Sequence, residues 1–240
     1  MSRPPLRSIA LVSATVLLAA AAIAGSWTGP LAPSFWFWVS VCLVGEGMWV
    51  RLPVGKVTVS MASCFHFAAL LLLPVGQAML VTAATGLIAE TFFMRKPSIR
   101  AIFNGAQAAL AVGAASSVLS LFGADSPNPS APLLHLQLLP LLIAAATYFA
   151  VNSGAVSIAV AVHERVSTVW AWRANFGTGY ELLSNATLFA LGTLLAANCV
   201  TLGLTATALI LFPVLVAYHG YRDHTQSRVE EQREIEQKAA

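Results

Sequence analysis

Long apolar runs separated by short polar segments make up almost the whole chain. A run of about 17 to 25 apolar residues can cross the ~30 Å hydrocarbon core of a bilayer as a helix. The runs are Ile9 to Ala24, Phe35 to Trp49, Val57 to Phe93, Ile102 to Phe122, Leu133 to Val162, Tyr180 to Ala197 and Leu202 to Tyr218. The third run is too long for one crossing, and Pro74-Val75-Gly76 divides it in two. The pattern predicts an all-α integral membrane protein, a helical bundle of about eight transmembrane helices.

Composition supports this pattern and excludes a soluble globular domain. Of the 240 residues, 58% are hydrophobic and only 10% are charged, whereas soluble domains carry about 25% charged residues. The net charge of +3 is spread over short loops, so it does not indicate nucleic acid as a partner.

The first apolar run has two interpretations. It follows the short basic segment Met1 to Arg7, and Ala22-Ile23-Ala24 has the small-x-small pattern of a signal-peptide cleavage site. The run is longer than most signal sequences, so we expect an uncleaved first span. Cleavage after Ala24 would leave seven spans with the same orientation.

Lysine and arginine are confined to five segments: the N-terminus, the 50–61 loop, the 94–100 turn, the 163–175 loop and the tail. The thirteen basic residues are Arg3, Arg7, Arg51, Lys56, Arg95, Lys96, Arg100, Arg165, Arg173, Arg222, Arg228, Arg233 and Lys238. The eight-span arrangement places all five segments on one side, and basic loops face the cytoplasm. We therefore predict that both termini are cytoplasmic, in a multi-pass protein of the bacterial inner (plasma) membrane.

The hairpin Gly86 to Gly113 contains the most polar intramembrane positions. Glu90 precedes its basic turn, and Asn104 and Gln107 follow it at i,i+3 spacing on one helix face. Further along the same helix, small residues spaced by four predict close packing against a neighbouring helix. These are Gly105, Ala109, Gly113 and Ser117.

Other spans carry polar groups toward the same side. Glu46 and Glu181 lie near the cytoplasmic ends of their helices, and the pairs Tyr148–Asn152 and Glu181–Asn185 have i,i+4 spacing. Intramembrane carboxylates are costly and usually face a partner or a wet cavity. We predict a ligand-binding pocket in the cytoplasmic half, formed by Glu46, Glu90, Asn104, Gln107, Tyr148, Asn152, Glu181 and Asn185.

A structural alternative for the glutamates stays open. Glu46 lies five residues before Arg51, Glu90 five before Arg95, and Glu181 eight after Arg173. Each carboxylate would then reach the interface and pair with its nearby arginine.

No residue pattern indicates catalysis or a metal site. The sequence contains no Ser/His/Asp pattern, P-loop, HExxH or GxGxxG. His66 and Cys64 are two residues apart, so they point to different faces of a helix. The cysteines lie in apolar runs without paired spacing. We expect no enzyme activity, no metal and no cofactor.

The sequence divides into a transmembrane domain, residues 1–221, and a charged cytoplasmic helical tail, residues 222–240. Acidic and basic residues alternate in the tail, and Glu234–Lys238 is a favourable i,i+4 pair. The tail is either a solvated helix or a linker to a cytoplasmic signalling domain or partner. A second copy of the chain, in a homodimer, and the lipid bilayer are the other partners we consider.

Four segments together resemble a known family. RLPVGKVTVSMASCFHFAALLLLPVG, GLIAETFFMRKPSIRAIFNGAQAAL, TYFAVNSGAVSIAVAV and ANFGTGYELL are similar in order and pattern to the integral-membrane sensory modules of bacterial signalling proteins (MASE-type modules). The resemblance covers Val50 to Tyr221 and includes the basic turn followed by F-N-x-x-Q. It implies a module that precedes HD-GYP phosphodiesterase or GGDEF cyclase domains. No motif of either output domain follows Tyr221 here, so the resemblance implies an input module, a fragment of a longer protein or a stand-alone relative.

We therefore expect a membrane-embedded sensor or signal-input module that relays a ligand or membrane state to a cytoplasmic partner or output domain. The alternative is the substrate-binding membrane subunit of a small-solute or vitamin transporter, which is also a small helical bundle. A lipid-modifying enzyme is a third class, which no acid/base or metal set supports.

Overall fold

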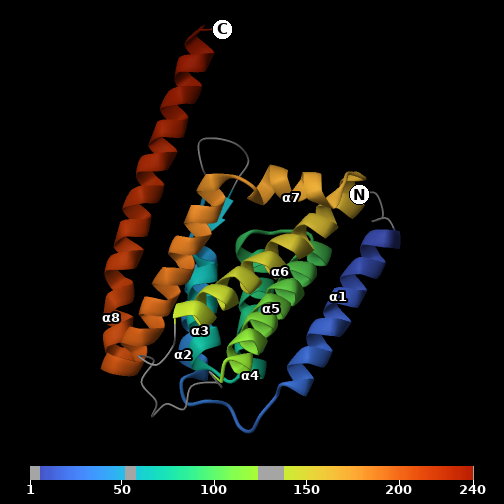
Figure 1. Cartoon of the computed structure of the whole chain (residues 1–240). Helices are drawn as coiled ribbons and strands as arrows, with labels where there is room; N and C mark the ends of the chain where they lie inside the picture. Colours follow the sequence, from blue (N-terminus) through green and yellow to red (C-terminus); the bar gives the residue numbers. More distant parts are fainter. Residues whose placement is uncertain (1–5, 52–57, 124–137, 240) are drawn as a thin grey trace.

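Helices account for nearly all of the structure, as the apolar pattern predicts. The computed structural model describes residues 6–51, 58–123 and 138–239. The elements are α1 (Leu6–Gly25), α2 (Phe35–Gly47), β1 (Trp49–Arg51), β2 (Thr58–Ser60), α3 (Ala62–Leu72), α4 (Val75–Ile88), the π-helical turn η1 (Ala89–Phe93), α5 (Ser98–Leu121), α6 (Leu138–Glu164), α7 (Thr168–Phe176) and α8 (Gly179–Ala239) (Figure 1). Within these described residues, five helices are long and apolar enough to cross a membrane, and α2 and α3 are shorter apolar helices.

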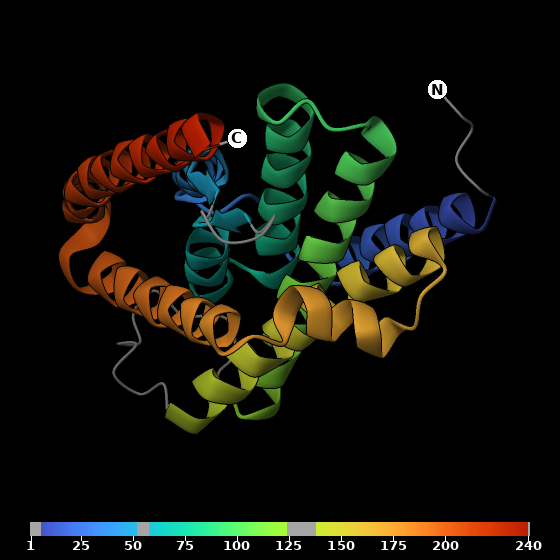
Figure 2. The ribbon, with the colours of Figure 1, turned by 90° about the horizontal axis from the view of Figure 1, so that it is seen from above.

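Helix α5 is the centre of the bundle. It packs against α4, α6 and α1. The small residues predicted to allow close approach do so: a Cβ on Gly105 would lie 2.8 Å from the backbone oxygen of Ala83, and one on Gly113 would lie 2.9 Å from the Met79 side chain. Helix α1 forms one edge of the bundle and both arms of α8 form the opposite edge (Figure 2).

The chain reverses direction where the sequence predicts turns. Pro74 follows the extended residue Leu73 and lies immediately before α4, and Pro97 lies immediately before α5. The predicted last pair of spans is one helical element, α8, broken at Gly203 (φ 81°, ψ 175°). Its first arm runs down along α3 and its second arm returns upward (Figure 1).

The described parts of the five basic segments lie at the same end of the molecule. The start of α1, the β1–β2 ribbon, the turn between α4 and α5, helix α7 and the C-terminal end of α8 all lie toward the top of Figure 1. The connection from α1 to α2, the turn from α3 to α4 and the turn between the two arms of α8 lie at the other end. The second arm of α8 extends beyond the bundle at the basic end.

Two details differ from the sequence-based expectation. The 50–61 loop contains a short antiparallel ribbon in which Trp49 pairs with Ser60 and Arg51 with Thr58. The 163–175 connector contains a helix, α7, because Ser167 accepts a hydrogen bond from Trp170 N and caps its first turn. Most of the polar segment 123–132, between the predicted runs that end at Phe122 and begin at Leu133, lies outside the described residues.

Candidate functional site: a buried polar core

Glu90 is the most constrained of the intramembrane carboxylates. It is 8% exposed, and the Nδ2 of Asn104 donates to both of its oxygens, at 2.7 Å to Oε1 and 2.8 Å to Oε2. It lies in the π-helical turn η1 at the end of α4. Such turns are frequent at functional sites, because the wider turn redirects a side chain that a continuous α-helix would leave elsewhere.

The basic partner of Glu90 is Lys96. Its Nζ lies 2.6 Å from Oε1 of Glu90, and its backbone N–H donates to the Glu90 carbonyl at 2.9 Å. The pairing of Glu90 with Arg95 that the sequence left open is therefore wrong. Arg95 has a positive φ of 51°, and this conformation turns the chain so that Lys96 is folded back over η1.

Glu46 pairs with a histidine. Its Oε1 lies 3.5 Å from Nε2 of His66 on α3, a residue only 3% exposed. The same nitrogen lies 3.4 Å from Oγ1 of Thr85 on α4. Arg51, the proposed alternative partner, has a side chain outside the described part of the structure.

The two carboxylates belong to one region. A Cβ on Gly86 would lie 3.4 Å from Oε1 of Glu46 and 3.8 Å from Cα of Gly105, and Glu90 follows Gly86 by one helical turn. Glu46 also lies within electrostatic reach of Glu90 and Lys96. We call this region the polar core; its members are Glu46, His66, Thr85, Glu90, Lys96 and Asn104.

In the part of the chain that the structure describes, the remaining predicted site residues are not bonded to this core, although Tyr148 lies within electrostatic reach of Glu46. Tyr148 stacks edge-on against Phe67 and Phe189, with ring centroids 6.3 and 5.3 Å away, and so joins α3, α6 and α8 in the apolar centre. Asn185 donates to the backbone oxygen of Glu181. Among the described residues, no hydrogen bond or ion pair joins these side chains to Glu90 or Glu46.

Three further predicted residues have no assigned polar contact with the core. Gln107 is 5% exposed, and within the described structure its Oε1 has no hydrogen-bond partner. Glu181 is 9% exposed, and its Oε1 also has no hydrogen-bond partner within the described structure. The described residues show no ion pair between Glu181 and Arg173. Asn152 is half-buried beside Ser153, which accepts a hydrogen bond from Nε1 of Trp172. The described contacts therefore do not support a single pocket that contains all eight predicted residues.

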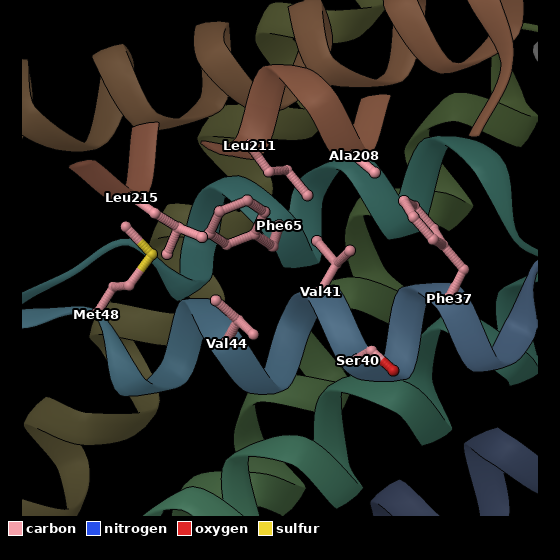
Figure 3. A pocket seen from close by; sticks show the side chains of 9 residues that line it. All are labelled: Phe37, Ser40, Val41, Val44, Met48, Phe65, Ala208, Leu211 and Leu215. Atoms are coloured by element: carbon pink, nitrogen blue, oxygen red, sulfur yellow. The ribbon is translucent and has the colours of Figure 1, made fainter. Parts of the chain in front are cut away.

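A second feature is an apolar pocket of about 240 Å³ on the α8 side of the bundle (Figure 3). Phe37, Val41 and Val44 of α2, Phe65 of α3, and Ala208 and Leu211 of the second arm of α8 line it. It is partly open to the surroundings. Phe65 lies between the pocket and the polar core, because its ring packs directly on Gly45, the residue before Glu46.

Comparison with known protein families identifies the family of this chain. The MASE9 family model matches residues 37–220. The chain belongs to the MASE9 family. MASE9 is a family of membrane-associated sensor domains, which confirms the resemblance to MASE-type sensory modules. No curated protein and no solved structure matches the chain.

All members of the polar core and the lining of the apolar pocket lie within the MASE9 region. Helix α1 precedes that region, and the part of α8 beyond residue 220 follows it. The MASE9 region is thus the multi-pass helical membrane unit from α2 to the second arm of α8.

Sequence reasoning missed three members of the polar core. His66 was considered only as a metal ligand and was set aside because Cys64, two residues away, points to a different helix face; Thr85 and Lys96 were not singled out as site residues. A partial signal was present: a histidine and a glutamate near the same end of adjacent antiparallel spans lie at the same height, and they meet if both helices are rotated to face each other. In the described parts of the chain, no three His, Cys, Asp or Glu side chains are close enough to hold a metal ion. The core instead contains carboxylates together with ammonium and amide donors. Such groups form hydrogen bonds and ion pairs that can change partners.

Proposed function

We propose that the chain is a signal-input module whose polar core responds to a ligand or a membrane state and whose α8 helix carries the response to the cytoplasm. The module acts without catalysis of its own, on an output domain or partner reached through Arg222–Ala240, and a homodimer is the assembly in which two such helices would meet. The family match favours a sensor over the transporter subunit.

The single observation that carries the proposal is that polar groups from four helices meet in the polar core around Glu46 and Glu90. The core draws its members from α2, α3, α4 and α5, so a change in the charge or partner of one carboxylate alters the packing of four helices. A buried charge with few partners favours two discrete arrangements, paired and unpaired, because intermediate geometries lose hydrogen bonds. A stimulus that prefers one arrangement shifts the population of both.

Helix α8 is the proposed route to the cytoplasm. Its first arm packs on α3, where a Cβ on Gly192 would lie 2.5 Å from the Cys64 oxygen. Helix α3 also carries His66, two residues beyond Cys64. Contact this close transmits small displacements of α3, because packed backbones do not compress. The second arm then runs to Ala239.

The topology part of the proposal is eight crossings with both termini in the cytoplasm of the bacterial inner membrane. The crossings are α1, α2, α3, α4 with η1, α5, α6 and the two arms of α8. Cysteines introduced singly at Ser98 and Thr168, and at Pro30 and Thr201, test it in a cysteine-free background in intact cells. A membrane-impermeant thiol reagent should label only the second pair. Labelling of the first pair from outside would contradict the orientation.

The signalling part is tested in the full chain with a reporter catalytic domain joined after Ala240. Glu90→Gln and Asn104→Leu should each shift the reporter output. Glu164→Gln is the matched control, because Glu164 is an exposed glutamate at the same end of the bundle. Output that stays unchanged in both core variants, at equal membrane abundance, would refute the polar core as the switch. Uptake of a vitamin by cells expressing the chain would favour the transporter class instead.

A further inference from the structure

The apolar pocket has a shape and chemistry that define its occupant. Its lining extends along α2 from Phe37 to Met48, about 16 Å at ~1.5 Å per residue. A volume of about 240 Å³ spread over that length leaves a narrow groove. Its elongated shape suits a linear hydrocarbon chain.

The lining offers nothing to a polar ligand. Ser40 carries the only hydroxyl among the lining residues, and its Oγ already donates to the Trp36 oxygen at 3.0 Å. No lining residue is charged. Water does not fill a groove without polar partners, and the carboxylate of a free fatty acid would find no donor within it. The polar end of the occupant must therefore remain outside, at the membrane surface.

The mouth of the groove faces hydrocarbon. Its lining residue Val44 is 46% exposed. The arm of α8 that forms its other wall is apolar on its exposed side, where Leu209 and Phe212 are 70% and 69% exposed. In a span these side chains contact lipid tails. A tail already at this surface enters without crossing any polar barrier.

We propose that this groove binds one acyl chain of a bilayer phospholipid and that the occupant acts on signalling. This coupling rests on the function proposed above, whereas the binding does not. The chain contacts Phe65, whose ring packs on Gly45 next to Glu46 of the polar core. It also contacts Ala208, Leu211 and Leu215 of the arm that continues to Ala239. A longer or kinked chain thus displaces the output arm and the wall of the polar core together.

Binding is tested with the full chain in vesicles of phosphatidylethanolamine and phosphatidylglycerol containing a trace of phosphatidylcholine with a photoreactive diazirine on one acyl chain. Peptide mapping should find crosslinks concentrated on α2 and on the second arm of α8. Ala208→Trp fills the groove and should reduce this labelling severalfold. Leu209→Trp adds the same side chain to the exposed side of the same arm and should leave it unchanged.

Three results would overturn the assignment. Equal labelling of α1 and α6 would show ordinary lipid contact around the whole bundle. Labelling unaffected by Ala208→Trp would place the acyl chain elsewhere. Displacement of the phospholipid probe by a small amount of free palmitate would show a fatty-acid site instead. None of these readouts uses the reporter, so failure of acyl-chain binding is distinct from failure of the polar-core switch.

Coupling is tested in the reporter fusion with the same two variants. Ala208→Trp fills the groove permanently and should therefore shift the reporter output. Leu209→Trp should leave the output at the level of the parent chain. Equal output from both variants, with Ala208→Trp having abolished labelling, would overturn the coupling and leave the binding site established.

Discussion

The Asn104 amide donates to both carboxylate oxygens of Glu90, at 2.7 and 2.8 Å, across the turn between α4 and α5. The two residues are 14 positions apart in sequence, and their contact fixes the relative position of the two central helices. Four predictions follow, two about this hairpin and two about the packing of α8.

The first prediction concerns the Glu90–Asn104 pair. Asn104→Leu should lower the unfolding free energy by about 1.5–3 kcal/mol, because it removes a hydrogen-bond donor from a buried charged group. A double-mutant cycle with Glu90→Leu, measured by SDS titration in mild detergent, should give a coupling energy of similar size. Asn198→Leu is the control, because the Asn198 amide donates only to its own helix, at the Leu194 oxygen. Additive effects of the two core substitutions would contradict the pairing.

The second prediction separates Lys96 from Asn104. The Lys96 side chain is 38% exposed, so water and salt screen its ion pair. Lys96→Met should therefore lower the unfolding free energy, measured in the same SDS titration, by only about 0.2–1 kcal/mol. This loss should be smaller still at high salt. Arg95→Met should cost less still, because Arg95 is exposed and makes no ion pair within the described structure. If Arg95→Met lowered the unfolding free energy more than Lys96→Met, then Glu90 would pair with Arg95 in the membrane.

The third prediction tests the contact between α3 and α8. A Cβ on Gly192 would lie 2.5 Å from the Cys64 backbone oxygen, and backbone cannot move aside as a flexible side chain can. Gly192→Ala should reduce thermal stability strongly and separate the two helices. Gly154→Ala is the matched control in α6: no atom lies within 4 Å of its added Cβ, so the change should be neutral or stabilising by about 0.5–1 kcal/mol. Similar stability of the two variants would refute the close approach.

The fourth prediction concerns the break in α8. Gly203 has φ 81° and ψ 175°, a region that essentially only glycine occupies and that costs other residues about 1–3 kcal/mol. Gly203→Ala should therefore destabilise the reversal, although its Cβ would meet no neighbour. The effect should appear as increased proteolysis of the second arm. Gly179→Ala, which also adds a Cβ in open space on the same helix, should show no such increase.

Several features of the fold follow from local sequence and were predictable. Apolar run length determines which segments are helices, because unpaired backbone groups are not tolerated in hydrocarbon. Pro74 and the spacing of Gly105 and Gly113 identified a turn and a packing face that the structure confirms. The β1–β2 ribbon was not predicted, because a ladder between two three-residue strands leaves almost no periodic signal.

The candidate site was predictable only in part. The sequence identified Glu90 and Asn104, since both lie near one end of a single hairpin whose geometry the short turn dictates. It did not identify His66 as the partner of Glu46, or separate Glu181 and Asn185 from the polar core. Those outcomes depend on how each helix is rotated about its axis, and side-chain packing among several helices sets that rotation.

The sequence alone determined that this chain is a helical membrane protein with its basic segments in five short stretches, because hydrophobic length and charge act locally on each span. Tertiary structure decided which polar groups meet: Lys96 rather than Arg95 on Glu90, and His66 on Glu46. It also created the groove between α2 and the second arm of α8. The reason is that a pairing or a cavity belongs to several helices at once, and no single stretch of sequence encodes their relative rotation.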